Sequence, residues 1–293
     1  MRINTNTAAM NTYSQLTSAN ASKSSSLAKL SSGLRINKAG DDAAGLAISE
    51  KMKNQISGMA QASRNAQDGI SLIQTAEGGL TETHSILNRM RDLAVQAKND
   101  TNTTEDRGAI QKEMDSLTKE VDRIANQTEF NGKKLLTADN GTDGTSFTFQ
   151  IGANKGQHIK LDVANMTAKE LGIGTAVDAV TTPGSEAPAT VKGPDVSTTG
   201  AAFDTVIENL DTAIEKVSTE RANLGATQNR LDHTVSNLAT TKENLSEANS
   251  RITDVDMAEE MMSFTKSNIL SQASTAMLAQ ANQMPQGVLQ LLQ

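Results

Sequence analysis

The side chains that most often do chemistry in proteins are few and scattered in this sequence. The histidines are His84, His158 and His233, and none belongs to an HExxH or similar paired motif. No phosphate-binding glycine loop, dinucleotide fingerprint or GxSxG nucleophile motif occurs. The lack of cysteine excludes thiol nucleophiles, thiolate zinc sites and iron–sulfur clusters. Because the carboxylates are spread along expected helices as solvated charge, the sequence predicts no enzyme, no cofactor and no metal site.

Composition also narrows the classes of partner. The chain has 293 residues, a net charge of −7 and an aromatic fraction of 2%, so its core must consist of many small aliphatic contacts. Nucleic-acid binders and anionic-membrane binders usually present a basic face, which this acidic chain does not predict. No run of 18 apolar residues occurs, and the N-terminus lacks the apolar segment of a cleavable signal peptide.

Two long segments carry a seven-residue apolar repeat. In the N-terminal half, over 44–98, the repeat includes Leu80 and Leu87. In the C-terminal half it runs from Phe203 to Ile252, through the leucines Leu210, Leu224, Leu231, Leu238 and Leu245. A seven-residue period keeps one helix seam against a neighbour, which is typical of coiled coils. These leucines are predicted to form the seam of a rod.

Between them, a third helix is expected over 105–128, with its start capped by residues of the polar turn NDTNTTED. The alternating segments 145–151 and 157–163 predict a β-hairpin. The stretch 174–202 holds three of the four prolines and is expected to be a linker without a core of its own. The predicted fold class is mainly α: an elongated coiled-coil bundle from the N- and C-terminal halves, plus a small β-hairpin region.

The two ends of the chain differ from the rest in charge. Residues 3–22 and 267–293 contain no Asp, Glu, Lys or Arg, yet carry apolar residues with helical spacing. Exposed faces of soluble proteins are usually charged, so these ends are expected to be covered by other chains and disordered until then. The spacing of Leu27, Leu30 and Leu34 fits one face of a helix. The predicted assembly residues of the terminal helices are Leu16, Leu27, Leu30, Leu34, Ile269, Met277, Leu278, Val288, Leu291 and Leu292.

Long segments of the chain resemble the bacterial flagellins. At the N-end the matching segments are MRINTN, LSSGLRINKAGDDAAGLAIS, NAQDGISLIQTAEGGL, RMRDLAVQA and FNGKKLL. At the C-end they are LGATQNRL, ANSRITDVDMAEEM and MLAQANQMPQGVLQLL. The resemblance covers 1–172 and 203–293, and these segments follow the order and spacing of the family.

The resemblance implies a domain organisation. Residues 1–43 and 254–293 would form an inner domain of terminal helices in the filament core, lining its channel. Residues 44–173 and 203–253 would form a rod-like bundle domain. The linker 174–202 would stand in place of the outer domains, which makes this a minimal flagellin.

The resemblance also implies partners and a destination. Flagellins polymerise with copies of themselves under a filament cap and join the hook through junction proteins. They are exported unfolded by the flagellar type III apparatus, without a cleaved signal peptide, and a chaperone binds near the C-terminus. The expected location is the extracellular filament, with no membrane insertion and no nucleic-acid partner.

A receptor surface follows from the same resemblance. Many flagellins are bound by the vertebrate Toll-like receptor 5, and the matching positions here are Arg89, Leu93, Gln96 and Glu113. At 100° per residue, the first three lie about 180–240° from Leu87, so Leu93 is expected to point outward and to need a partner.

Three alternatives stay open. The hook–filament junction protein of the same fold is the nearest, although the AQANQMPQGVLQLL ending favours flagellin. A flagellin with a metallopeptidase insert would need an HExxH motif and a longer linker. A cytosolic coiled-coil adaptor would stay monomeric or dimeric with its ends intact.

Overall fold

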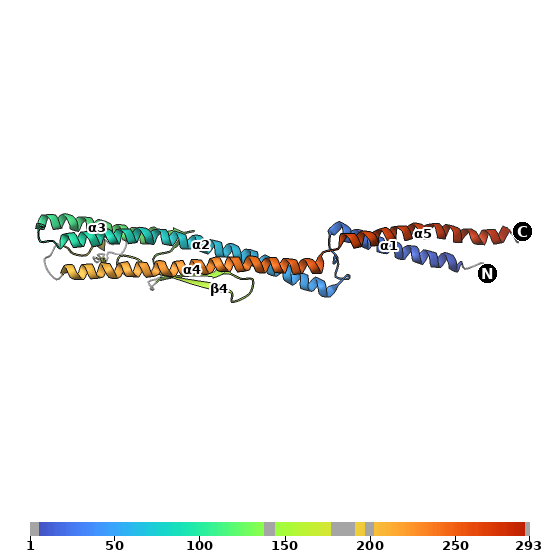
Figure 1. The fold of residues 1–293 in the computed structure, drawn as a ribbon, viewed down its shortest axis with the longest axis horizontal. Helices are drawn as coiled ribbons and strands as arrows, with labels where there is room; N and C mark the ends of the chain where they lie inside the picture. Colours follow the sequence, from blue (N-terminus) through green and yellow to red (C-terminus); the bar gives the residue numbers. More distant parts are fainter. Residues whose placement is uncertain (1–5, 138–143, 177–190, 197–201, 291–293) are drawn as a thin grey trace, which may run out of the picture. The chain divides into compact units, whose positions relative to one another are not determined.

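A computed structural model describes residues 6–137, 144–176, 191–196 and 202–290, with the side chains of 175, 176, 191, 202 and 284–290 left aside (Figure 1). Within these ranges the chain forms five α-helices and three two-stranded antiparallel sheets. The chain divides into two compact units. Unit 1 comprises 1–57 and 241–293, and unit 2 comprises 58–240. The mainly helical fold class is confirmed.

Unit 2 is built around three helices. They are α2 (Ala43–Ala97), α3 (Thr104–Gln127) and α4 (Ala202–Thr253), and Figure 1 shows α3 and α4 beside the C-terminal half of α2. Arg89 of α2 pairs with Glu113 of α3 at 2.8 Å, and Arg91 of α2 pairs with Asp211 of α4 at 2.6 Å. Neighbours on two sides therefore give α2 a wide buried face.

The start of α3 is fixed by the polar turn before it. Thr103 is the N-cap: its hydroxyl accepts the Asp106 N–H at 3.2 Å, and the Asp106 carboxylate accepts the Thr103 N–H at 3.0 Å. This reciprocal pair is a capping box, which satisfies donors that the first turn would leave free. The Thr103 hydroxyl and N–H bonds lower the pKa of Asp106. The expected third helix and its capping by this turn are confirmed.

The predicted hairpin is also confirmed. Strands β3 (Gly144–Gln150) and β4 (His158–Ala164) pair antiparallel, with Phe147 opposite Leu161. Alternate side chains of β4 (Ile159, Leu161 and Val163) are buried, as the period of two requires. The loop after β3 lies close to α2, because a Cβ built at Gly58 would stand 2.7 Å from the Ala153 Cβ. The hairpin thus covers one side of the bundle.

The core of unit 2 joins these elements. Its largest fully buried side chains include Ile73, Leu80 and Leu87 of α2, Met114 of α3, and Leu210 and Leu224 of α4. Leu135, Leu136 and Leu171 add contributions from the segments around the hairpin. Burying one such side chain contributes about 1.5–3 kcal/mol, so this cluster is the main source of stability in unit 2.

Part of the stretch expected to be a linker packs against α3. Strands β5 (Thr175–Ala176) and β6 (Val191–Lys192) form an antiparallel pair. The Gln111 side chain of α3 donates to the Pro194 carbonyl at 3.1 Å and accepts the Val196 N–H at 2.7 Å. Val196 is fully buried. The described residues 191–196 are therefore attached to the bundle and share its core, which proline content alone did not indicate; 177–190 and 197–201 lie outside the described residues.

Unit 1 consists mainly of a helix pair. Helix α1 (Thr7–Ser32) lies along α5 (Met257–Gln290), and contacts from Asn6 to Ala281 and from Lys29 to Glu260 show that the two run antiparallel. Helix α1 ends at Gly33, whose φ of 70° is the left-handed conformation that glycine adopts without strain.

The connectors next to these helices are joined by backbone hydrogen bonds. Leu34 forms an antiparallel bridge with Asp254. The Arg35 N–H donates to the Thr253 carbonyl at 2.6 Å, and the Val255 N–H donates to the Gly33 carbonyl at 3.1 Å. Leu34 was expected on the same helix face as Leu27 and Leu30. That expectation was wrong, because the Gly33 cap ends α1 before Leu34, which lies in the bridged connector.

Candidate functional site

The helix pair of unit 1 buries little apolar area. Its buried side chains include Ala19 and Ser26 on α1 and Ser267 and Ala281 on α5, and all four are small. Polar bonds supplement this contact: Lys23 donates to the Asn268 side chain at 2.9 Å, and the Ser271 hydroxyl donates to Asn20 at 2.9 Å. Small buried residues contribute less than leucines do, so the pair lacks a core comparable with that of unit 2.

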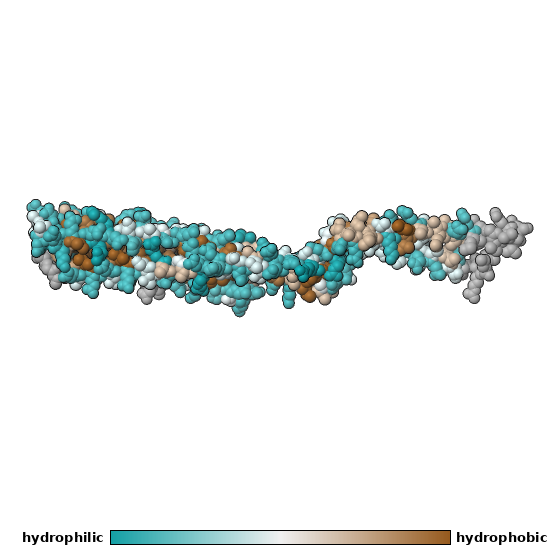
Figure 2. Space-filling view, in the orientation of Figure 1, coloured by the Kyte–Doolittle hydropathy of each residue, from teal (hydrophilic) through white to brown (hydrophobic). Residues whose placement is uncertain are grey.

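Large apolar side chains of unit 1 instead face outward. Among the described residues, ten of the eleven most exposed large hydrophobic side chains belong to unit 1, and Val95 is the exception. The ten are Met10, Tyr13, Leu27, Ile48, Met257, Met261, Met262, Ile269, Leu270 and Met277. We call this set the apolar surface of unit 1. Figure 2 shows mainly tan residues, with some brown and teal, along the visible face of the α1–α5 pair; the visible face of the bundle is mostly teal, with brown patches.

Apart from Leu34, the residues predicted to mediate assembly fall into three groups. Leu16, Leu30 and Leu278 are half-buried on α1 and α5. Leu27, Ile269 and Met277 are exposed, at 55%, 60% and 62%. Val288 lies on α5, but its side chain is outside the described set, as are Leu291 and Leu292 entirely. The exposed fractions matter because a side chain already buried within its own chain has no further area to bury against another.

The predicted seam leucines differ along the rod. Leu80, Leu87, Leu210, Leu224 and Leu231 are fully buried, whereas Leu238 and Leu245 are half-buried. The repeat placed all of them on one seam and does not by itself distinguish them. The difference has a structural cause. At Leu231, Phe149 of the hairpin lies beside the seam, since both side chains come within 3.4 Å of a Cβ built at Gly69 of α2. Near Leu245, α4 contacts α2, as in the Ser49–Asn249 hydrogen bond of 2.8 Å. Two helices enclose a seam less completely than two helices and a hairpin do.

The predicted receptor-binding residues do not share one environment. Arg89 and Glu113 are exposed and form an ion pair at 2.8 Å, and Gln96 is exposed. Leu93, expected to point outward, is only 2% exposed and belongs to the core of unit 2. The angular argument assumed one buried seam through Leu87, but α2 also packs against α3, so its buried face extends to Met90, Leu93 and Ala97. The orientation predicted for Leu93 was wrong.

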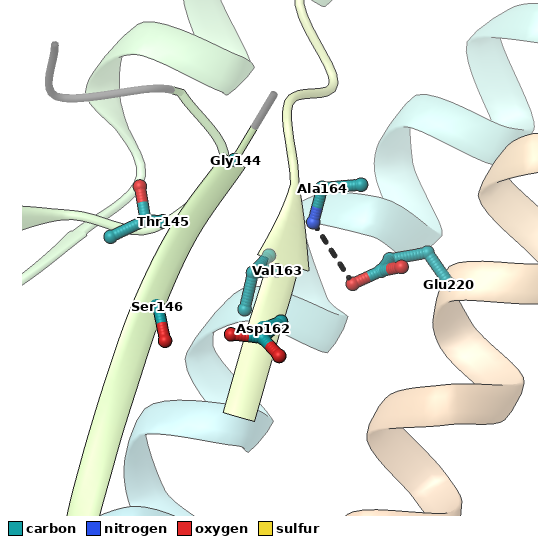
Figure 3. Close-up of a pocket in the computed structure, with 7 residues that line it drawn as sticks. All are labelled: Gly144, Thr145, Ser146, Asp162, Val163, Ala164 and Glu220. Carbon is teal, nitrogen blue, oxygen red and sulfur yellow. Dashed lines mark hydrogen bonds between the residues drawn. The ribbon is translucent and has the colours of Figure 1, made fainter. Parts of the chain in front are cut away.

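A pocket lies where the hairpin meets α4 (Figure 3). Its volume is about 420 Å³, and it is lined by Gly144, Thr145, Ser146, Asp162, Val163, Ala164 and Glu220. Glu220 is 6% exposed, and its carboxylate accepts the Ala164 N–H at 3.2 Å. This hydrogen bond holds the end of β4 against α4, so the Glu220 carboxylate has a structural role.

The other chemistry-bearing residues are dispersed. His84, His158 and His233 lie on α2, β4 and α4 respectively. In the described ranges, no three His, Asp or Glu side chains are grouped so as to hold a metal ion. Nor does any helix in the described part of the chain combine the length and apolarity needed to cross a membrane. The surface most open to a functional interpretation is therefore the apolar surface of unit 1.

Comparisons with known proteins agree with these observations. Residues 3–141 match the family model of the bacterial flagellin N-terminal helical region, and residues 207–292 match that of the C-terminal helical region. The chain is 55% identical to a flagellin of Bacillus subtilis and 48% identical to flagellin FlaB2 of Treponema pallidum, each over the full length of both chains.

One solved structure shows a similar fold. A putative flagellar hook-associated protein from Vibrio parahaemolyticus is 16% identical, with a TM-score of 0.56, over 73% of this chain and all of the other. The crystal structure of Bacillus cereus flagellin is 33% identical, with a TM-score of 0.47, over 60% of this chain and 88% of the other.

Proposed function

Because this chain belongs to the bacterial flagellin family, we propose that it is a non-catalytic structural subunit that self-assembles into the flagellar filament and so serves motility. The observation that carries the self-assembly is the apolar surface of unit 1. Its helices have almost no core of their own, and 3–22 and 267–293 carry no charge. A surface of this kind is suited to burial against further copies of the same chain.

The mechanism that we infer couples ordering to assembly. Fixing the backbone of one residue costs about 1–2 kcal/mol, and the small contacts between α1 and α5 offset little of that. Each exposed side chain such as Ile269 or Met277 would contribute about 1.5–3 kcal/mol when a neighbouring subunit covers it. The terminal helices would therefore become stable only as the subunits stack. A head-to-tail contact that does not close on itself extends as an open helical polymer.

The intact protein tests this proposal directly. In dilute buffer it is expected to be a monomer whose terminal helices are cut rapidly by a protease, while unit 2 survives. After addition of filament seeds or a precipitant, electron microscopy should show long tubes of constant diameter, and the same ends should now resist the protease. If nuclear magnetic resonance showed the terminal helices to be rigid and protected already in the monomer, the proposed coupling of ordering to assembly would be wrong.

Partners and location follow from membership of the family. We infer that the subunit reaches the cell exterior through the flagellar type III export apparatus without a cleaved signal peptide, and that a chaperone holds its C-terminal segment beforehand. In the filament it would meet the cap at one end and the hook-junction proteins at the other. The likeness to a hook-associated protein concerns the fold alone, and the flagellin matches over both halves favour the filament subunit over the junction protein.

A second proposed role is recognition by Toll-like receptor 5. It is supported by the exposed Arg89–Glu113 pair, with Gln96 exposed on the same helix as Arg89. These groups could reach a receptor from a free subunit without unfolding. Leu93 would contribute indirectly, by supporting this part of α2 from within the core.

Receptor binding can be tested with two arginines of the same helix. The Arg89→Ala substitution is expected to weaken binding of the receptor ectodomain at least about tenfold, as measured by surface plasmon resonance. Arginines near the centre of an interface often carry a large share of the binding energy. Because the Arg89–Glu113 pair is exposed, its loss should lower stability by only about 0.2–1 kcal/mol.

Arg91→Ala is the matched control, since Arg91 is similarly exposed and pairs with Asp211 of α4 instead. It should bind the receptor as the parent does. If both variants lost the same receptor affinity, the effect would not be specific to Arg89. If Arg89→Ala bound the receptor as the parent does, Arg89 would not belong to the receptor site.

A further inference from the structure

The methionines of this protein are divided between two environments. Met10, Met257, Met261, Met262 and Met277 are 49–68% exposed, and all belong to unit 1. Met59, Met90, Met114 and Met166 are 0–6% exposed, and all belong to unit 2. Met52 is half-buried, and the side chains of Met1 and Met284 lie outside the described set. The exposed group forms half of the apolar surface proposed to be covered in the filament.

Thioether exposure decides where oxidation can occur. A peroxide transfers one oxygen atom to the methionine sulfur: the sulfur is oxidised by two electrons to a sulfoxide, the O–O bond breaks, and hydrogen peroxide is reduced to water. The core of unit 2 excludes a peroxide from Met90 and Met114, whereas an approach to Met262, at 68% exposure, is open. The product is a polar side chain where an apolar one stood.

We propose that the five exposed methionines are peroxide modification sites, and that their oxidation prevents free subunits from assembling while unit 2 stays folded. This inference rests on the proposed self-assembly through unit 1. When apolar neighbours cover a sulfoxide, its S=O group loses its hydrogen bonds to water, which costs free energy. An interface that buries methionine is therefore destabilised by the oxidised form. Assembled subunits would be protected, because the covering neighbour excludes the peroxide.

Position along the helices adds to the effect. Met257, Met261 and Met262 occupy the first two turns of α5, where Asp256 caps the helix by accepting the Ala258 N–H at 2.9 Å. Met257 and Met261 are neighbours on one helix face, since residues four apart lie together, and Met262 points to an adjacent face. Oxidation here would convert three apolar side chains at the start of α5 into polar ones, a few residues from the bridge between Leu34 and Asp254.

The test treats the free subunit with hydrogen peroxide and follows three quantities. Peptide mass spectrometry should find sulfoxide at the five exposed methionines well before Met59, Met90, Met114 or Met166. The melting temperature of unit 2 should be unchanged. The critical concentration for seeded polymerisation should rise by about tenfold or more, as expected when at least one buried apolar side chain per subunit is lost.

A variant with all five residues replaced by leucine is the matched control, because leucine has a similar volume and cannot be oxidised. It should polymerise as the parent does, before and after peroxide. Treatment of the oxidised parent with a methionine sulfoxide reductase and a thiol should restore polymerisation, and this second measurement decides the matter if the leucine variant itself assembles poorly.

Several results would overturn the inference. One is that parent protein with sulfoxide at all five sites polymerises normally. Another is that the leucine variant, which retains Met1 and Met284, loses assembly after peroxide treatment. The third is that the reductase fails to restore assembly. Untreated parent that never polymerises would instead refute the proposed function itself, and this inference with it.

Discussion

A chain that ends at Lys266 is expected to fold its helical bundle and to form no filaments. The deletion removes most of α5, including Ile269, Leu270 and Met277 of the apolar surface. It also leaves α1 without its partner, because the Asn6–Ala281 and Asn20–Ser271 contacts are lost. The core cluster of unit 2 lies entirely within 66–235, so its stability does not depend on the deleted residues.

The measurement combines thermal unfolding, sedimentation and electron microscopy of seeded samples. The truncated protein should melt within a few degrees of the parent and stay monomeric at concentrations where the parent polymerises fully. Ile269→Asn removes one apolar contact without shortening the chain and should raise the critical concentration, whereas Gln272→Ala, at an exposed polar position of the same helix, should have little effect. Filaments formed by the truncated chain would contradict assembly through α5.

The Leu231→Asp substitution is expected to lower the stability of the bundle more than most surface substitutions do. Leu231 is fully buried, at a point where three elements meet. A Cβ built at Gly69 of α2 would stand 3.4 Å from Leu231 and 3.2 Å from Phe149 of the hairpin. A carboxylate placed there has no partner and loses its water, which costs about 3–5 kcal/mol when the charge stays buried.

At about 2–4 °C per kcal/mol for a domain of this size, the melting temperature should fall by roughly 6–20 °C. Two variants that introduce the same charge serve as comparisons. Leu238→Asp should cost less, because that seam position is half-buried, and Asn229→Asp, on the exposed side of α4, should be nearly neutral. Equal effects at Leu231 and Leu238 would show that enclosure by the hairpin does not decide the energetics of the seam.

Much of this architecture can be predicted from local patterns. The seven-residue repeats, the turn before Thr103 and the alternation around Phe147 each depend on residues close in sequence, and each corresponds to an element of the structure. Helical periodicity, capping and strand alternation are local properties, so a single sequence is enough to indicate them. The absence of charge from both ends likewise pointed to unit 1 as the surface of interest.

Other features depended on which elements become neighbours. Leu93 was placed on the wrong side of α2, because the number of helices that pack around α2 cannot be derived from α2 alone. The uneven burial of Leu231 and Leu238 has a similar origin, since Phe149 of the hairpin, remote in sequence, helps to enclose Leu231. Val196 is buried through the side chain of Gln111, far away in sequence.

The sequence by itself determined that this protein is a mainly helical subunit with two charge-free ends, because composition and periodicity are properties of the chain. The tertiary structure alone decided which apolar side chains are buried within the subunit and which stay exposed for contact with other copies. Burial is the reason: it depends on the distance between elements remote in sequence, and that distance is set only when α1 meets α5 and α2 meets both α3 and α4.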